Sequence, residues 1–407
     1  MPHLRKRACR VSLGVLVGLA MLVVVPLCGA AAPTTYMTDL GAFCKEVDEG
    51  YPFFELKGIQ KDWAAAKARL ATQVRRCRSD SDFLGLVVEA IGVLRDAHMT
   101  IQDPKAQMPP PPAEYYPGLS FLPAIKNTVV VMYPPRGHEA TLKTGTLVVA
   151  IDGKPARAVL DERAKRAWAK GGSFSSPQRA RLFEYRIPLR GRQGEKHTLA
   201  YFDGRKPKTM TLVSTVESKG WPHVYNPPKD LTAADRSFSY GRLPSGSGYM
   251  YIRRIDGSTA TGMKEALEKV PGARGWVVDL CGNGGGGYDA SLIETIKGMP
   301  RPVAVVIDAG CISAGETLAR DFAHYAGARL FGEKTAGSSS SKRQWTFPSG
   351  IASIRISVRS RWRADRKPIE FNGIDPDVPV EAVPPEVAGG VNSAIRRAEV
   401  YLRTAPK

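Results

Sequence analysis

The chain has 407 residues, of which 43% are hydrophobic and 24% are charged. This length and balance are typical of a globular protein with two or three domains and exclude a disordered or fibrous chain. The formal net charge of +19 indicates attraction to anionic surfaces. No nucleic-acid-binding motif accompanies that charge, and the basic residues are scattered along the sequence, so we expect no nucleic-acid partner.

The first 32 residues have the pattern of a secretory signal peptide. Four basic residues within positions 5–10 precede an apolar run over 11–27, and three alanines at 30–32 supply a small-residue cleavage site. The apolar run falls slightly short of the roughly 20 residues that a membrane-spanning helix needs. We therefore expect an exported protein, periplasmic or secreted, with no membrane span once the leader is removed.

The pattern over 33–107 predicts an N-terminal helical region. Apolar residues recur at helical spacing over 83–94, and either Asp80 or Ser81 is expected to cap that helix. The prolines at 109–112 follow as a stiff spacer and mark a domain boundary.

A second unit, rich in β-strands, is expected over 115–217, followed by a proline-containing linker over 218–241. The core over 242–407 alternates strands and helices, which favours an α/β fold with parallel strands buried between helices. Strands are predicted at 128–132, 146–151, 198–202, 275–280 and 302–307, helices at 156–169, 318–326 and 392–402, and a hairpin turn at 348–350.

Ser313 stands where the strand predicted at 302–307 gives way to the helix predicted at 318–326. The start of a helix favours developing negative charge because its first N–H groups are unpaired. Ser313 is therefore a candidate nucleophile, although serine is also a common helix cap. Four glycines at 284–287 follow the other buried strand, and such a loop can present N–H groups as an oxyanion hole.

These two stretches resemble the catalytic core of the S41 peptidases, the tail-specific or C-terminal-processing protease family. The resemblance implies an α/β catalytic core of the crotonase or ClpP-like ββα superhelix type. It also implies a serine endopeptidase with Ser313 as its nucleophile and with protein or peptide substrates. Cys281 departs from the family pattern, which usually has arginine there. The four segments that carry the resemblance are 279–285, 313–316, 332–337 and 373–377.

The resemblance further implies that the oxyanion is held by backbone N–H groups of Gly284 or Gly285 and of Ala314. After attack by Ser313, an acyl-enzyme would form and water would then hydrolyse it.

The base that activates Ser313 distinguishes two branches of the family. In one branch the base is a lysine, but the corresponding position here is Ser338, and Lys334 and Lys342 are out of register. The other branch, which includes the tricorn-like members, takes a histidine from an N-terminal segment similar to 96–100. His98 is therefore the expected base, which brings this chain nearer to the Ser–His branch.

The remaining histidines are less suitable as the base. His324 lies eleven residues beyond Ser313 on the same predicted helix, about 16 Å away by helix rise. The others fall in the second unit (His138 and His197), in the linker (His223) and in the leader (His3).

A carboxylate is expected to orient the imidazole of His98. Glu370 stands in a place similar to that of the glutamate of tricorn-like members, and Asp96 is the alternative. Those members also have a serine directly before the histidine, where this chain has Ala97.

The segment 143–155 resembles the hairpin of PDZ domains, which capture a peptide C-terminus as an added edge strand. A PDZ-like domain over 115–217 would suit a protease that selects chain ends. The alternative is a β-rich spacer with no binding role.

Four cysteines lie beyond the leader, and an even number in an exported protein favours disulfides. Cys44 and Cys77 fall on the apolar faces of two expected helices, which predicts a bridge between them. Cys281 and Cys311 each follow a core strand and would form a second bridge if those strands are neighbours. The absence of Cys-x-x-Cys spacing argues against a metal site, and no cofactor is expected.

Two other functional hypotheses remain open. The missing lysine and Cys281 leave room for a catalytically inactive peptide-binding protein that keeps the S41 fold. A different acyl hydrolase with a crotonase-like core is the third hypothesis.

Overall fold

The computed structural model describes residues 33–204, 206–219 and 227–405. The expected signal peptide over 1–32 lies outside the described residues, and so does part of the expected linker, 220–226. Within the described ranges, no helix combines the length and the apolar character that crossing a bilayer requires.

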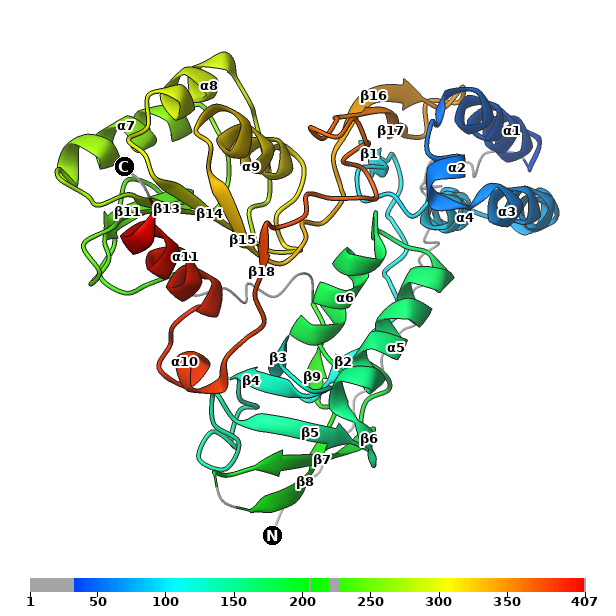
Figure 1. Ribbon diagram of the computed structural model, residues 1–407. Helices are drawn as coiled ribbons and strands as arrows, with labels where there is room; N and C mark the ends of the chain where they lie inside the picture. Colours follow the sequence, from blue (N-terminus) through cyan, green and yellow to red (C-terminus); the bar gives the residue numbers. More distant parts are fainter. Residues whose placement is uncertain (1–32, 205, 220–226, 406–407) are drawn as a thin grey trace, which may run out of the picture.

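Three groups of elements make up the molecule (Figure 1). The first is a seven-stranded sheet with helices on both faces, the second an antiparallel sheet with two helices, and the third a set of helices packed on a three-stranded sheet. Each group has its own hydrophobic core.

The seven-stranded sheet is the α/β core that the sequence predicts. Its strand order is β10-β11-β12-β13-β14-β15-β18, and the strands from β12 onward run parallel. Side chains alternate between the two faces, so that Val278 of β13 packs beneath α7, α8 and α9, whereas Val277 packs against α11 (Figure 1). The strands are β10 (Thr232–Ala233), β11 (Phe238–Arg242), β12 (Gly248–Ile252), β13 (Trp276–Asp279), β14 (Val303–Ile307), β15 (Arg329–Gly332) and β18 (Val378–Pro379), and the helices are α7 (Thr259–Lys269), α8 (Ala290–Lys297), α9 (Ala314–Tyr325), α10 (Pro384–Ala388) and α11 (Ser393–Thr404).

The stretch expected as a linker contributes to this sheet. β10 and all but the last residue of β11 fall within 218–241, and β11 pairs with β12 over its whole length. The prolines that suggested a linker precede these strands, so the core begins earlier in the chain than predicted.

The N-terminal helices share their core with a hairpin from the last third of the chain (Figure 1). Ile354 and Ile356 of that hairpin are fully buried, and the ring of Phe347 lies 6.1 Å from that of Phe43. Segments far apart in the sequence therefore complete one hydrophobic cluster. Its elements are α1 (Pro33–Gly50), α2 (Phe54–Lys57), α3 (Gln60–Gln73), the 3-10 turn η1 (Val74–Arg76), α4 (Asp80–Val93), β1 (Thr100–Gln102), β16 (Ser340–Thr346) and β17 (Ser353–Ser360).

The cap of α4 is one residue earlier than the sequence suggested. Ser79 accepts a hydrogen bond from the amide of Asp82, and the carboxylate of Asp82 accepts one from the amide of Ser79. This reciprocal pair satisfies two amides at the start of the helix, which neither Asp80 nor Ser81 does.

The second group has the strand order β3-β4-β5-β7-β8, with β6 paired to β5. β3 is an edge strand, and α6 packs against it. The start of α6 also reaches the core, because Arg179 donates from Nη1 to the carbonyl of Ala309 at 2.8 Å. The elements are β2 (Tyr115–Tyr116), β3 (Ser120–Pro123), β4 (Val129–Tyr133), β5 (Leu147–Ile151), β6 (Lys154–Pro155), α5 (Ala156–Lys170), α6 (Pro177–Arg186), β7 (Lys196–Phe202), β8 (Pro207–Val213) and β9 (Val216–Glu217), and β2 pairs with β9.

The four cysteines are free thiols, and neither expected disulfide is formed. β13 and β14 are neighbours, as the second bridge required, but Cys281 packs on the α11 side of the sheet and Cys311 on the α9 side. Cys44 and Cys77 do share a cluster. Burial raises the pKa of both of these thiols, which keeps them in the unreactive protonated form.

Candidate active site

Ser313 joins the end of β14 to the start of α9, as the sequence predicts, but it is not an ordinary cap. Its φ and ψ are 56° and −122°, whereas a capping serine has an extended backbone. A non-glycine residue held in such a conformation costs about 1–3 kcal/mol and is typical of functional sites. The amide of Ser313 donates to the carbonyl of Ser338 at 2.8 Å, and the side chain remains half-buried.

The carboxylate of Glu316 fixes the loop on which Ser338 lies. Its two oxygens accept hydrogen bonds from the hydroxyl of Thr335 at 2.6 Å and from the amides of Gly337 and Ser338 at 2.7 and 2.8 Å. It also lies 3.2 Å from the amide of Ser313. Burial raises the pKa of Glu316 to about 8, against the effect of these hydrogen bonds. One side chain thus ties the turn at Ser313 to the loop over 335–338.

The glycine loop after β13 lies directly against Ser313. A Cβ atom placed on Gly285 would come 2.7 Å from the Cβ of Ser313, and Gly285 has a φ of +73°. Only glycine fits such a close approach at positive φ. Gly284, by contrast, has open space where a Cβ would lie.

The two glycine amides that were expected to form the oxyanion hole already have acceptors. The amide of Gly284 donates to the carbonyl of Arg253 at 3.0 Å, and that of Gly285 donates to Oδ1 of Asn283 at 2.8 Å. The expectation for these two amides is therefore wrong in this conformation. The amide of Ala314, at the first turn of α9, has no backbone acceptor among the described residues.

A chain of hydrogen bonds connects the segment that carries His98 with the loop beside Ser313. The amide of Ala97 donates to the hydroxyl of Ser175 at 3.1 Å, and that hydroxyl lies 3.0 Å from the hydroxyl of Ser338. Ser338 in turn accepts from the amide of Ser313. Three parts of the chain that are remote in sequence therefore converge here, and Ser175 comes from the turn between α5 and α6.

The imidazole of His98 is neutral at ordinary pH. Burial, with the charges of Lys342 and Lys57, lowers its pKa to about 4, although Asp96 acts in the opposite direction. Its Nδ1 atom is buried and has no hydrogen-bond partner among the described residues. A neutral imidazole can accept a proton.

Neither predicted carboxylate orients that imidazole. Oδ1 of Asp96 accepts the backbone amide of His98 at 2.8 Å rather than a ring nitrogen. Glu370 is fully buried, and its two oxygens accept from Nζ of Lys57 at 2.8 Å and from the amide of Ser339 at 2.9 Å. Glu370 thus contacts the loop after Ser338, but its charged partner is Lys57 and not the expected imidazole of His98.

Lys57 is the residue of this site that sequence reasoning missed. Its side chain has no exposed surface, and Nζ also donates to the hydroxyl of Tyr51 at 3.0 Å and to the carbonyl of Arg95 at 2.8 Å. Asp96 lies 3.7 Å from the same Nζ. The one available signal was a lysine in the largely apolar stretch 51–59, where Glu55 is the only other charged residue. Because Lys57 holds both carboxylates, it anchors the segment before His98 to the loop after Ser338.

The other candidate bases lie elsewhere. Nζ of Lys334 pairs with Asp375 at 2.8 Å, and His324 is exposed on α9. His197 contacts Asp152 in the second group. His3 and His223 lie outside the described residues.

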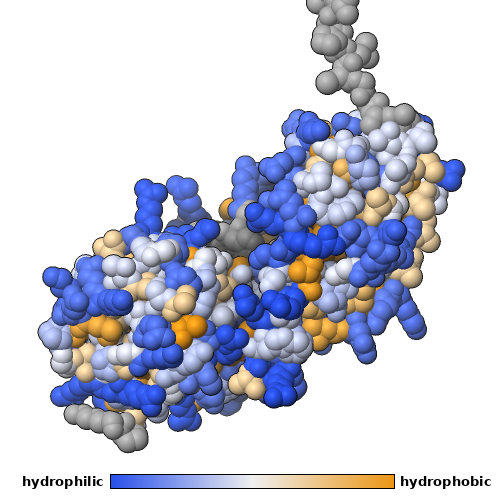
Figure 2. All heavy atoms as spheres, turned by 90° about the horizontal axis from the view of Figure 1, so that it is seen from above, coloured by the Kyte–Doolittle hydropathy of each residue, from blue (hydrophilic) through white to orange (hydrophobic). Residues whose placement is uncertain are grey.

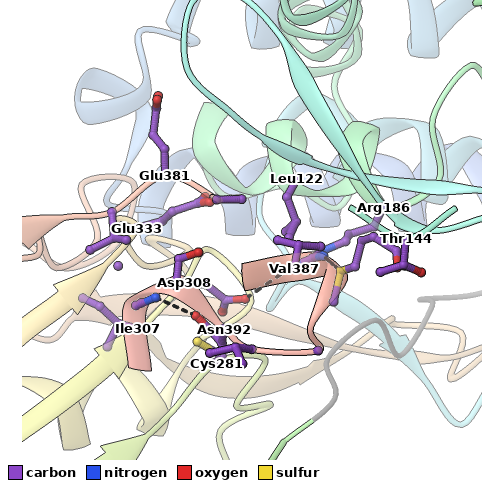
Figure 3. A pocket seen from close by; sticks show the side chains of 18 of the residues that line it. Leu122, Thr144, Arg186, Cys281, Ile307, Asp308, Glu333, Glu381, Val387 and Asn392 are labelled. Carbon is purple, nitrogen blue, oxygen red and sulfur yellow. Dashed lines mark hydrogen bonds and ion pairs between the residues drawn. The ribbon is translucent and has the colours of Figure 1, made fainter. Parts of the chain in front are cut away.

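A pocket of about 140 Å³ opens near the carboxyl ends of β13, β14 and β15 (Figure 3). Its walls include Cys281 and Asp308 from the core and Arg186 from α6, and its described lining includes neither Ser313 nor His98. Asp308 links the pocket to the active-site loops, because Oδ1 accepts the amides of Gly282 and Gly310 at 2.8 Å while Oδ2 lies 4.0 Å from Arg186.

Comparisons with known proteins relate part of the chain to a peptidase family and its fold to solved structures. Residues 294–380 match the model of peptidase family S41, a range that includes Ser313 and Glu370 but not His98. No curated protein matches the chain.

Solved structures show a shared fold. Mature CPAF complexed with lactacystin is 11% identical, with a TM-score of 0.59 over 91% of this chain and 98% of that chain. A candidate peptidase from Parabacteroides merdae is 14% identical, with a TM-score of 0.52 over 91% of this chain and 98% of that one. The segment 294–380 is therefore similar to peptidase family S41, as the sequence motifs indicated, and the chain shares the fold of these solved structures.

Replacing Lys57 by methionine is expected to lower the free energy of unfolding by about 3–5 kcal/mol, because it leaves Glu370 buried without its counter-charge. Chemical denaturation measures this loss. The matched control is Lys67→Met, which removes a partly exposed pair with Asp48 and is expected to cost about 1 kcal/mol or less. Equal losses in the two variants would contradict the role assigned to Lys57.

Gly285→Ala is expected to reduce peptide hydrolysis at least about 100-fold, because the new methyl group displaces Ser313 by a distance that catalysis does not tolerate. Gly284→Ala is the control, since its methyl group meets open space. Initial rates on one fluorogenic peptide compare the two variants, with circular dichroism to verify folding. If both variants hydrolyse the peptide at the parental rate, the close contact with Ser313 has no catalytic importance.

Proposed function

We propose that the protein is an exported serine endopeptidase that acts through an acyl-enzyme on Ser313, with His98 as the general base. The observation that carries this proposal is the backbone of Ser313, held at φ 56° at a strand-to-helix junction against the glycine loop. The segment of His98 is connected to the adjoining loop through Ser175 and Ser338. Export is supported by the leader pattern over 1–32. A histidine base would place the enzyme in the Ser–His branch of the family.

In the first half of the reaction, Oγ of Ser313 attacks the scissile carbonyl while His98 takes its proton. The C–N bond then breaks, and His98 returns the proton to the leaving amine. In the second half His98 takes a proton from water, which attacks the ester, and the acid product leaves as Ser313 is regenerated. The amide of Ala314 would stabilise the oxyanion, helped by the start of α9.

The second group of elements would bind the C-terminus of the substrate in the manner of a PDZ domain. Its edge strand β3 leaves one side of the sheet for an added peptide strand. The hydroxyl of Ser120 on that strand is buried and has no hydrogen-bond partner in the part of the chain that the structure describes. The turn from α5 to α6 connects this group to the loop beside Ser313 through Ser175. A bound chain end would therefore lie on the unit that contacts the catalytic loop.

A catalytically inactive peptide-binding protein is the second candidate. Two observations favour it: Nδ1 of His98 has no carboxylate partner, and the amides of Gly284 and Gly285 are already bonded. In this alternative the second group binds peptides and the core is a support.

A fluorophosphonate probe separates the two candidates, because it labels only an activated serine. We expect labelling of the parent, none of Ser313→Ala, and labelling slower by about 100-fold or more in His98→Ala, the usual contribution of a general base. Ser291→Ala, which removes an exposed serine of α8, serves as the control. A folded parent that resists the probe would instead support the peptide-binding protein.

The pH profile tests the base separately. Because the base acts only as neutral imidazole, and burial lowers the pKa of His98 to about 4, kcat/KM should fall on the acid side near pH 4 rather than near 6.5. Lys342→Gln removes one of the charges that lower this pKa, so the fall should move to higher pH.

The control for this measurement is Lys334→Gln, whose ammonium pairs with Asp375 instead. Circular dichroism at each pH distinguishes titration from unfolding. A profile that Lys342→Gln leaves unchanged would argue against His98 as the titrating base.

A further inference from the structure

The segment 339–369 carries eight basic residues and one acidic residue, Asp365. It comprises the β16–β17 hairpin and the loop that follows. Although basic residues are scattered along most of the sequence, the fold gathers these in one place.

Most of these cations have no counter-charge. Arg343 pairs with Glu46, and Arg363 pairs with Asp375 at 2.8 Å. The others that are exposed and form no ion pair among the described residues are Lys342, Arg355, Arg359, Arg361 and Arg366. Asp365, the one acid of the segment, lies within ion-pair distance of Arg363 and Lys367. The five other cations create a positive potential that attracts anionic ligands.

Three cations of the hairpin, Lys342, Arg355 and Arg359, lie on one face. Ile354 and Ile356 point into the core shared with the N-terminal helices, so the residues between and beyond them, including Arg355 and Arg359, lie on the opposite face. The pairing of β16 with β17 puts Lys342 opposite Ser357, on that same face. Figure 2 views the molecule from the side on which the hairpin lies in Figure 1, and hydrophilic side chains dominate that view.

The following loop is held in place by its own hydrogen bonds. Arg320 donates from Nη1 to the carbonyl of Trp362 at 3.0 Å, and the amide of Ile369 donates to the carbonyl of Arg361 at 2.8 Å. These bonds fix Trp362 with its side chain 55% exposed. An exposed tryptophan between arginines is an unusual surface feature that suits binding.

This surface adjoins the catalytic serine. The amide of Arg361 donates to the carbonyl of Ser339 at 3.3 Å, and the hydroxyl of Ser339 donates to the carbonyl of Ser313 at 3.3 Å. Two hydrogen bonds therefore separate the arginine loop from Ser313. On the other side, β1 begins two residues after His98 and pairs with β17 at Arg355. The cations thus border the place where a polypeptide must lie to reach Ser313.

We infer that Arg355, Arg359, Arg361, Arg366 and Trp362, called here the cationic rim, bind an acidic segment of the polypeptide substrate next to the scissile bond. This inference rests on the proposed peptidase function and specifies its substrate class. An acidic polypeptide fits better than an anionic membrane, because the rim continues into the active-site loops.

The test measures binding to the Ser313→Ala variant, so that no cleavage intervenes. Two fluorescent peptides are compared by anisotropy, one with four Asp and Glu residues and one with Asn and Gln in their places. At 50 mM salt the acidic peptide should bind about tenfold more tightly, and at 300 mM salt this preference should largely disappear because salt screens exposed charges.

Variants that remove charges show which residues cause the preference for the acidic peptide. In the Ser313→Ala background, Arg355→Gln with Arg359→Gln should abolish most of the preference and leave the affinity for the neutral peptide unchanged. Trp362→Ala should weaken the binding of both peptides. The matched control is Lys165→Gln with Arg166→Gln, which removes two exposed charges from α5 and should leave the preference intact.

Equal affinity for the two peptides at 50 mM salt would overturn the inference. So would binding of phosphatidylglycerol vesicles that depends on Arg355 and Arg359 without any preference for the acidic peptide, since the rim would then bind a membrane. Failure of the proposed function has a different signature, because the parent would resist the fluorophosphonate probe whatever the peptides show.

Discussion

The ion pair between Lys57 and Glu370 is the interaction on which the candidate active site depends. It is completely buried and joins α2, near the beginning of the chain, to a loop near its end. Because a buried charge is costly without its partner, the pair forces these two regions together. Asp96, two residues before His98, and Glu370 share the same ammonium group.

The nucleophile turn has a second, independent support in Glu316. That carboxylate receives its hydrogen bonds from the turn at Ser313 and from the loop over 335–338. The site is thus assembled from three directions: Lys57 from the N-terminal helices, Glu316 from the core, and Ser175 from the turn before α6. A serine in a strained conformation persists where the surroundings determine its geometry so fully.

Most of the fold could be predicted from local patterns in the sequence. The features that could not be predicted depend on contacts between residues far apart in the chain. The strand before Ser313 and the helix after it were predicted because hydrophobic periodicity is local, and β14 and α9 confirm them. The role of Lys57 had no such signal, since its partner lies 313 residues away. The amides of Gly284 and Gly285 already donate hydrogen bonds to Arg253 and Asn283, and those bonds depend on how the glycine loop folds. The predicted disulfide between Cys281 and Cys311 is absent for a related reason. Two strands can be neighbours while the residues that follow them lie on opposite faces of the sheet.

The N-terminal helices share their core with the β16–β17 hairpin, which constrains when these helices can finish folding during synthesis. Phe43 and Trp63 leave the ribosome early during synthesis. The side chains that pack in the same core, including Phe347 and Ile354, follow about three hundred residues later. Before the hairpin is synthesised, the early helices lack these side chains, which complete their apolar core among the described residues. A chain truncated before the hairpin would therefore have an open N-terminal core and would lack Glu370, the partner of Lys57.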